Sequence, residues 1–183
     1  MTHPGADPQP HDPACEVAHG DRPAPSIEDR VLVAVYATPL ASVLLRWAGE
    51  LGFATVLVEP DAAAPDDDHR AAAGRVAVDP VDAGVDARTD VVVTDHDRDD
   101  LGTTMAPLLR AQPRWIGIIG SPRHTPPHVE ALRGHGVPDA TIERVQRPIG
   151  LDIGSRTPAE IALSVLAGLL ADRNDRPLAR ARP

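Results

Sequence analysis

The sequence predicts an α/β domain with a doubly wound, mostly parallel sheet, and two observations carry this prediction. Short runs of β-branched and aliphatic residues alternate with segments whose apolar residues recur at helical spacing. The connections between these segments are short, which favours parallel strands joined by crossover helices. We expect one domain over residues 31–173, between a disordered tail at 1–30 and a flexible tail at 174–183, because both tails lack large apolar residues to bury.

The first strand and helix have clear boundaries. Residues 31–35 are apolar throughout, as in a strand that is buried on both faces. Thr38 and Pro39 then offer an N-cap and a first-turn proline for a helix, which Gly52 ends. The apolar positions of that helix are Leu40, Leu44, Trp47 and Leu51.

Four further strands and three further helices complete the pattern. The expected strands cover residues 55–58, 75–78, 90–93 and 115–119. The expected helices contain Leu101 to Leu109, residues 127–133, and a last segment from Pro158 to about Ala171 that begins with the capping box Thr157–Glu160. The polar stretch 61–70, with three consecutive aspartates, is expected to be an exposed loop.

Composition excludes several kinds of chemistry. All 18 basic residues of the 183 are arginine, so neither a Schiff-base lysine nor a phosphate-loop lysine is available. The single cysteine, Cys15, excludes an intramolecular disulfide and a multi-cysteine zinc site. A net charge of -9 and only four aromatic residues argue against nucleic-acid binding. Because the sequence contains neither a signal-peptide pattern nor an apolar run long enough to span a membrane, we expect a cytoplasmic protein.

The turn after the first strand departs from a dinucleotide-binding fingerprint. That fingerprint places glycines where this chain has Tyr36 and Thr38, and only Ala41 fits its small third position. Glu59, at the end of the second strand, stands where a ribose-binding carboxylate is expected. The favoured interpretation is a Rossmann-like scaffold without tight dinucleotide binding, and NAD(P) binding is the alternative.

Two loops have the composition of anion sites. Gly120 and Ser121 follow a buried strand, and Arg123 adds positive charge nearby. The run Gly154, Ser155, Arg156 and Thr157 precedes the capped last helix. It predicts a second place where backbone N–H groups and an arginine could meet a phosphate. The alternative is that these glycines only form turns and the arginines are solvated.

The acidic segment from Thr94 to Asp97, which includes His96, is a weaker candidate for a metal site. Consecutive side chains seldom converge on one ion, so a solvated loop and helix start is the favoured interpretation.

Three blocks of sequence resemble the XdhC/CoxI family. Residues 115–121 followed by Arg123 are similar to its YIGLIGSRRK stretch, and 91–100 are similar to its VVVxTHDHxxD segment. Residues 147–162, RPIGLDIGSRTPAEIA, closely resemble its PIGLDIGAxTPEEIA signature, which includes Asp152.

The resemblance implies an accessory protein for molybdenum hydroxylases such as xanthine dehydrogenase and aerobic CO dehydrogenase. The resemblance further implies that such proteins bind the molybdenum cofactor, promote its sulfuration with a cysteine desulfurase and deliver it to the apoenzyme. The resemblance covers about residues 31–174 and corresponds to the family's C-terminal Rossmann-like domain. Cys15 has no preceding Gly-Gly pair and does not match the cysteine motif of the N-terminal domain.

This chain departs from the family pattern at several positions. Residues 36–39, Tyr-Ala-Thr-Pro, replace the family's Gly-Ala-Gly-His turn, and Asp95 replaces a histidine. Pro122, His124 and Gly168 replace an arginine, a lysine and a glutamate.

Three functions therefore follow from the sequence. The first is a non-catalytic maturation factor that acts with molybdenum hydroxylase subunits and a desulfurase. The second is an NAD(P)-dependent oxidoreductase, and the third is a degenerate scaffold that forms a homodimer or a hetero-complex. The candidate ligand-binding residues are Thr38, Glu59, Gly120, Ser121, Arg123, Asp152, Gly154, Ser155, Arg156 and Thr157.

Overall fold

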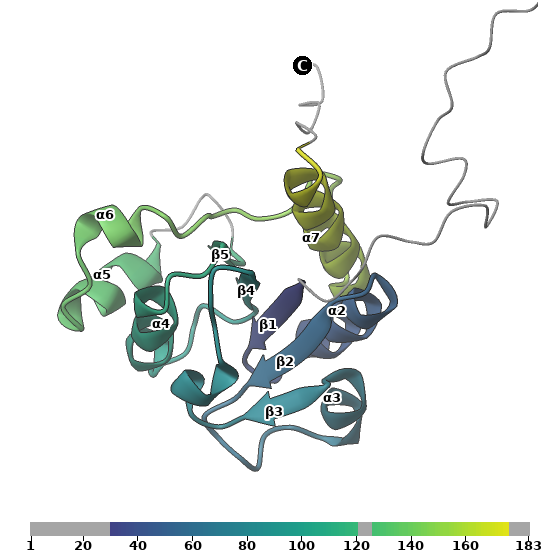
Figure 1. The fold of residues 1–183 in the computed structure, drawn as a ribbon, viewed down its shortest axis with the longest axis horizontal. Coiled ribbons are helices and arrows are strands. Elements are labelled where there is room, and N and C mark those ends of the chain that lie inside the picture. The colour runs from purple at the N-terminus through teal and green to yellow at the C-terminus, as the bar shows by residue number, and fades with distance from the viewer. Residues whose placement is uncertain (1–29, 121–125, 176–183) are drawn as a thin grey trace, which may run out of the picture.

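A computed structural model describes residues 30–120 and 126–175 as a parallel five-stranded sheet between two helical layers (Figure 1). The strands lie in the order β3-β2-β1-β4-β5, and every neighbouring pair is parallel. Their bounds are β1 Val31–Val35, β2 Ala54–Val58, β3 Arg75–Ala77, β4 Thr89–Val93 and β5 Trp115–Ile118. The strand order reverses between β1 and β4, which confirms the doubly wound α/β prediction.

Alternate residues along each strand point to opposite faces of the sheet and pack into two separate hydrophobic cores. The helices are α2 Pro39–Glu50, α3 Asp67–Ala72, α4 Leu101–Arg110, α5 Pro127–Gly134, α6 Asp139–Ile142 and α7 Pro158–Arg173, with a 3-10 turn η1 over Pro80–Ala83. Helices α2 and α7 cover one face of the sheet through Leu32, Ala34 and Leu57, whereas α4 and α5 cover the other (Figure 1). A sheet covered on both faces explains the continuously apolar strands.

The predicted starts of α2 and α7 are confirmed by their caps, whereas α2 ends at Glu50, before Leu51, and α7 continues to Arg173. Thr38 is the N-cap of α2, where its hydroxyl accepts from the Ala41 amide at 3.2 Å, and Pro39 is the first residue. Gly52 follows the helix with φ 82°. At α7, Thr157 and Glu160 form the predicted reciprocal capping box.

The expectation of an exposed loop over 61–70 is wrong for its second half. Asp66 caps helix α3 by accepting from the amide of His69, and that histidine is buried. An Asp at the N-cap and acids in the first turn stabilise a helix start, so the aspartates begin a helix here. The third and fifth strands also end one residue earlier than expected, at Ala77 and Ile118.

The expected tails lie almost wholly outside the described residues, which begin at 30 and end at 175. Asn174, expected to start the second tail, is the C-cap of α7, and its amide donates to the Leu170 carbonyl. Over the described part of the chain, no helix has the length and apolar character that a membrane crossing requires.

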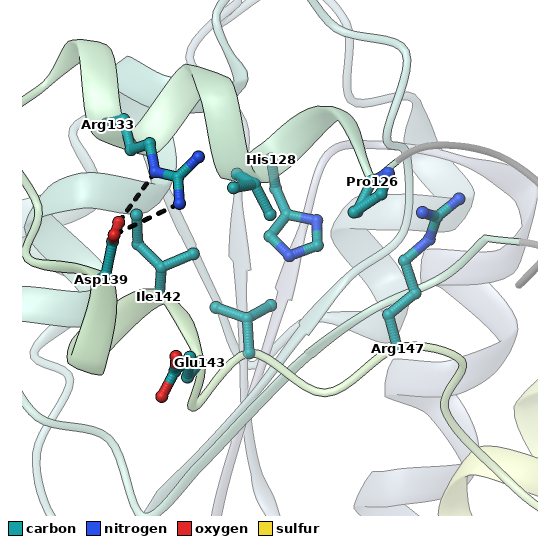
Figure 2. Close-up of a pocket in the computed structure, with 9 residues that line it drawn as sticks. Pro126, His128, Arg133, Asp139, Ile142, Glu143 and Arg147 are labelled. Atoms are coloured by element: carbon teal, nitrogen blue, oxygen red, sulfur yellow. Dashed lines mark hydrogen bonds and ion pairs between the residues drawn. The ribbon is translucent and has the colours of Figure 1, made fainter.

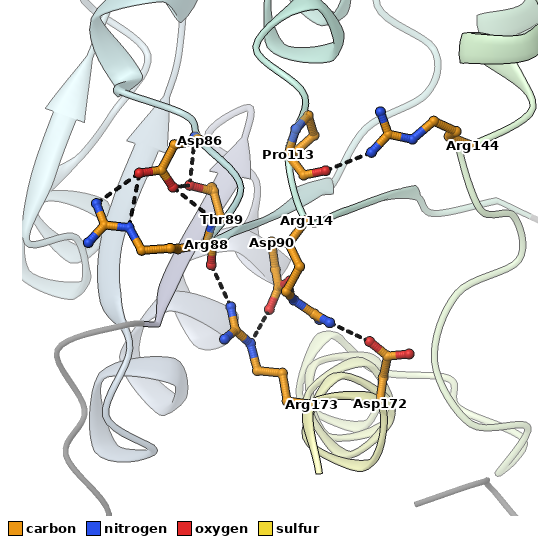
Figure 3. A network of polar contacts seen from close by, with 9 residues as sticks. All are labelled: Asp86, Arg88, Thr89, Asp90, Pro113, Arg114, Arg144, Asp172 and Arg173. Atoms are coloured by element: carbon orange, nitrogen blue, oxygen red, sulfur yellow. Dashed lines mark hydrogen bonds and ion pairs between the residues drawn. The ribbon is translucent and has the colours of Figure 1, made fainter. Parts of the chain in front are cut away.

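A buried carboxylate ties α7 to the amino-terminal edge of the sheet (Figure 3). Asp90 of β4 is fully buried, and its two oxygens accept from Nε of Arg114 and Nε of Arg173, each at 2.7 Å. Arg114 also pairs with Asp172, and Arg173 donates to the Arg88 carbonyl. Because both oxygens are neutralised and hydrogen-bonded, the buried charge is tolerated.

Replacing this carboxylate should destabilise the protein. We expect Asp90→Asn to lower the free energy of unfolding by about 3–5 kcal/mol, because it leaves two arginines around an uncharged amide. Urea denaturation followed by circular dichroism measures the change. Asp139→Asn, which removes an exposed carboxylate paired with Arg133, is the matched control and should change stability little. Equal losses in both variants would contradict a special role for Asp90.

Candidate functional site

The turn after β1 is occupied by a buried tyrosine. Tyr36 has φ 77°, a left-handed conformation that a non-glycine residue seldom adopts. Its ring packs in the core on the α4 side, and the Arg98 guanidinium stacks over it at 4.5 Å from the ring centre. Burial raises the pKa of the Tyr36 hydroxyl well above its ordinary value. Tyr36 thus adopts a φ that favours glycine while its side chain packs into the core.

Glu59 makes its contacts within the protein. Its side chain is only 1% exposed, and its two oxygens accept from the amides of Ala37 at 2.8 Å and Asp61 at 3.1 Å. One of these oxygens also pairs with Arg98 at 3.3 Å. The carboxylate predicted to meet a ribose therefore holds the β1–α2 turn to the end of β2.

Thr38 lies at the switch point between β1 and β4. Its hydroxyl donates to Oγ1 of Thr94 at 2.9 Å, and that threonine hydroxyl donates to the Val35 carbonyl at 2.8 Å. His69 of α3 contacts the carbonyl oxygen of Thr38 at 2.9 Å. This hydrogen-bond chain joins the ends of two strands to α3, so Thr38 has a structural role.

A cleft of about 740 Å³ lies farther along the sheet edge, beside β5 and α7. A parallel bridge between Gly117 and Gln146 adds the chain after α6 to the sheet and brings residues 148–155 to the carboxyl end of β5. Four of the predicted site residues line this cleft: Gly120, Asp152, Gly154 and Ser155. Thr38, Glu59, Arg156 and Thr157 are absent from its wall.

Two glycines allow close approaches at the cleft wall. Gly150 has φ 83°, and a Cβ there would lie 2.6 Å from Oγ of Ser164 in α7. At Gly120 a Cβ would lie 2.5 Å from Nε of Arg147. The space above Gly120, predicted to receive a phosphate, thus borders an arginine side chain.

The predicted anion loop before α7 uses its amides internally. The carboxylate of Glu160 accepts from the amides of Arg156 at 2.6 Å and Thr157 at 3.1 Å. Ser155 donates its hydroxyl to the Glu160 carbonyl at 3.2 Å. The helix therefore supplies its own anion at this end, because a capping-box glutamate occupies the donors that a phosphate would use.

Two predicted site residues and the candidate metal segment remain to be placed. Ser121 and Arg123 lie outside the described residues. His96 lines the cleft, and its Nε2 lies 3.5 Å from Asp97. Among the described residues, no three metal-ligating side chains come together to hold an ion.

Sequence reasoning did not select several residues of the cleft wall. His96 stands only within the acidic segment 94–97, and no sequence pattern singles out Ser164 of α7. Ile149 and Gly150 lie inside the signature block, so membership of that block was the available signal. Their distance from β5 depends on the bridge at Gln146, which local patterns do not indicate.

The fold and cleft define a Rossmann-like domain whose first turn departs from the dinucleotide fingerprint. Residues 32–169 match the family described as the XdhC Rossmann domain, and the chain belongs to that family.

Two relatives show the extent of the similarity. An uncharacterized protein of Escherichia coli K12, YqeB, is 34% identical over 101 residues, which are 55% of this chain and 18% of that protein. A crystal structure of a Bacillus halodurans protein described as a xanthine dehydrogenase superposes with a TM-score of 0.64 at 25% identity. That match covers 83% of this chain and 45% of the other, so the chain spans less than half of either relative.

Removing the charge of Glu59 should loosen the β1–α2 turn. We expect Glu59→Gln to lower the free energy of unfolding by about 1–3 kcal/mol, since an amide cannot serve both backbone amides and Arg98. Thermal and urea unfolding measure the loss. Asp97→Asn, an exposed acid on the same sheet edge, is the control. A Glu59 variant as stable as this control would contradict the role assigned to the carboxylate.

Dinucleotides should bind weakly. Because Tyr36 replaces a fingerprint glycine and Glu59 is occupied, we expect NAD and NADP to show no saturable binding below about 1 mM. Isothermal titration calorimetry of the full chain measures this. Micromolar affinity for either cofactor would favour the oxidoreductase hypothesis instead.

Proposed function

We propose that this chain assists the maturation of a molybdenum hydroxylase of the xanthine dehydrogenase or CO dehydrogenase type, and that it does so without catalysing a reaction. The observation that carries the proposal is the position of the family signature: residues 148–155 of that block form much of the cleft wall. The family match and the xanthine dehydrogenase description of the Bacillus protein support a link to such an enzyme.

The cleft has the size and lining of a site for an organic cofactor. Its volume of about 740 Å³ falls within the range of small-molecule sites, roughly 300–1,000 Å³. Ile119, Ile149 and Ile161 give it apolar surface, while Asp152 and Ser155 add polar groups. We assign the molybdenum cofactor as the cargo held there.

The predicted residues have different parts in this proposal. Gly120 and Gly154 let the backbone approach the cargo, and Asp152 and Ser155 offer oxygen atoms to it. Arg156 and Thr157 hold the mouth of the cleft in place through the capping box. Thr38 and Glu59 stabilise the β1–α2 turn through hydrogen bonds.

The partners in this proposal are hydroxylase subunits and a cysteine desulfurase, in the cytoplasm. A separate chain or domain would supply the chemistry on sulfur, because Cys15 does not match the family's cysteine motif.

An interaction scaffold without a ligand is the second candidate. The internal use of Glu59 and of the Arg156 and Thr157 amides favours it, because these groups are satisfied without a ligand. In that case the protein would contact its partners while the cleft stays empty.

One pair of measurements separates the candidates. Purified chain should bind released molybdenum cofactor and co-purify with the hydroxylase, and Asp152→Ala should weaken cofactor binding about tenfold or more while leaving co-purification intact. Asp82→Ala, an exposed acid on η1, is the matched control. Co-purification without any cofactor binding would favour the scaffold.

Loss of the gene tests the pathway itself. We expect lower hydroxylase activity in a deletion strain, restored by the wild-type chain. Unchanged hydroxylase activity together with no co-purifying hydroxylase or desulfurase would contradict a role in maturation.

A further inference from the structure

A second pocket, of about 360 Å³, lies between α5, α6 and the chain that leads to Arg147. It is lined by different residues from the cleft, since no residue is common to their described walls. Its size lies at the lower end of the range for small-ligand sites, about 300–1,000 Å³.

A buried histidine projects into this pocket. The His128 side chain comes from the first turn of α5, and Figure 2 shows its ring in the space between Arg147 and Glu143. The residue is only 4% exposed, and its Nδ1 is buried with no hydrogen-bond partner among the described residues. Buried ring nitrogens nearly always have a partner, so this atom indicates a missing one.

The surroundings of His128 favour the neutral form of its imidazole. Burial, and then the positive charge of Arg147, hold the pKa of the His128 imidazole below its ordinary value. An anion beside these two side chains would offset that charge and meet the nitrogen. The combination thus suits a ligand oxygen that carries negative charge.

Two further features place positive potential at the same end of the pocket. Helix α5 begins at Pro127, its N-cap residue Pro126 makes no side-chain capping hydrogen bond, and a helix N-terminus attracts anions. The Arg147 guanidinium has five N–H donors, so it can bind a ligand in addition to a protein group. By contrast, Arg133 forms two hydrogen bonds with Asp139 and is neutralised (Figure 2).

The opposite wall of the pocket determines where a ligand can carry apolar surface and where it can carry charge. Val129, Ile142 and Val145 give apolar surface, and Glu143 would repel a second negative charge at that end. A suitable ligand therefore has its charge at one end only.

We propose that this pocket binds a small organic anion with one carboxylate or phosphate group beside Arg147 and His128, and with its apolar part against Val129, Ile142 and Val145. This site is separate from the cleft of the proposed function. Arg147 connects the two regions, because it also lies against Gly120 at the cleft wall.

The test is a titration of the isotope-labelled full chain followed by NMR at the His128 ring. Benzoate, phenyl phosphate and uncharged benzamide are the probes, and the two anions distinguish a carboxylate from a phosphate ligand. We expect saturable shifts with at least one anion, at an affinity tenfold or more above that of benzamide. This comparison needs no variant, so a folding defect cannot obscure it.

Charge removal completes the test. Arg147→Gln should weaken binding of the anion at least tenfold, whereas Arg144→Gln, which removes the same charge outside the pocket, should not. Equal affinity for benzoate, phenyl phosphate and benzamide, or unchanged anion binding in a folded Arg147→Gln chain, would overturn the proposal. Neither outcome depends on hydroxylase maturation.

Discussion

The carboxyl edge of the sheet is organised around the buried carboxylate of Glu59. A buried negative charge must be fully hydrogen-bonded, and here the partners are two backbone amides and Arg98. These bonds draw together the ends of β1 and β2, and they place Arg98 over the ring of Tyr36. In a dinucleotide-binding domain the same edge faces a ligand. In this protein it is closed by contacts among its own side chains.

The cleft lies on the other side of the switch point from this closed turn. The polar and glycine-rich surface lies beside β5, where residues 148–155 join the sheet edge through the bridge at Gln146. Gly150 lets that segment contact α7 closely, and Gly120 makes room for Arg147. The cleft and the histidine pocket therefore lie on two sides of one arginine, Arg147.

The position of α7 is fixed at the far end of the sheet. Asp90 holds Arg173 in the last turn of α7 and Arg114 just before β5, so a single carboxylate sets the helix against the strand. Ile161 and Ser164, which line the cleft, lie in the first half of the same helix. Helix α7 thus contributes to the Asp90 contacts at one edge of the sheet and to the cleft wall at the other.

Local patterns in the sequence determined the strands, the caps at Thr38 and Thr157 and the doubly wound class, because periodicity and capping depend on neighbouring residues. They also indicated the block 147–162 through its resemblance to a family. Helix α3 was missed, because its burial depends on His69 contacting Thr38, 31 residues away. Only the tertiary structure decided that Glu59 and Glu160 bind amides of their own chain, and that His128 and Arg147 share a pocket. These contacts form between groups that folding brings together, so a residue's type and its position in the sequence do not determine them.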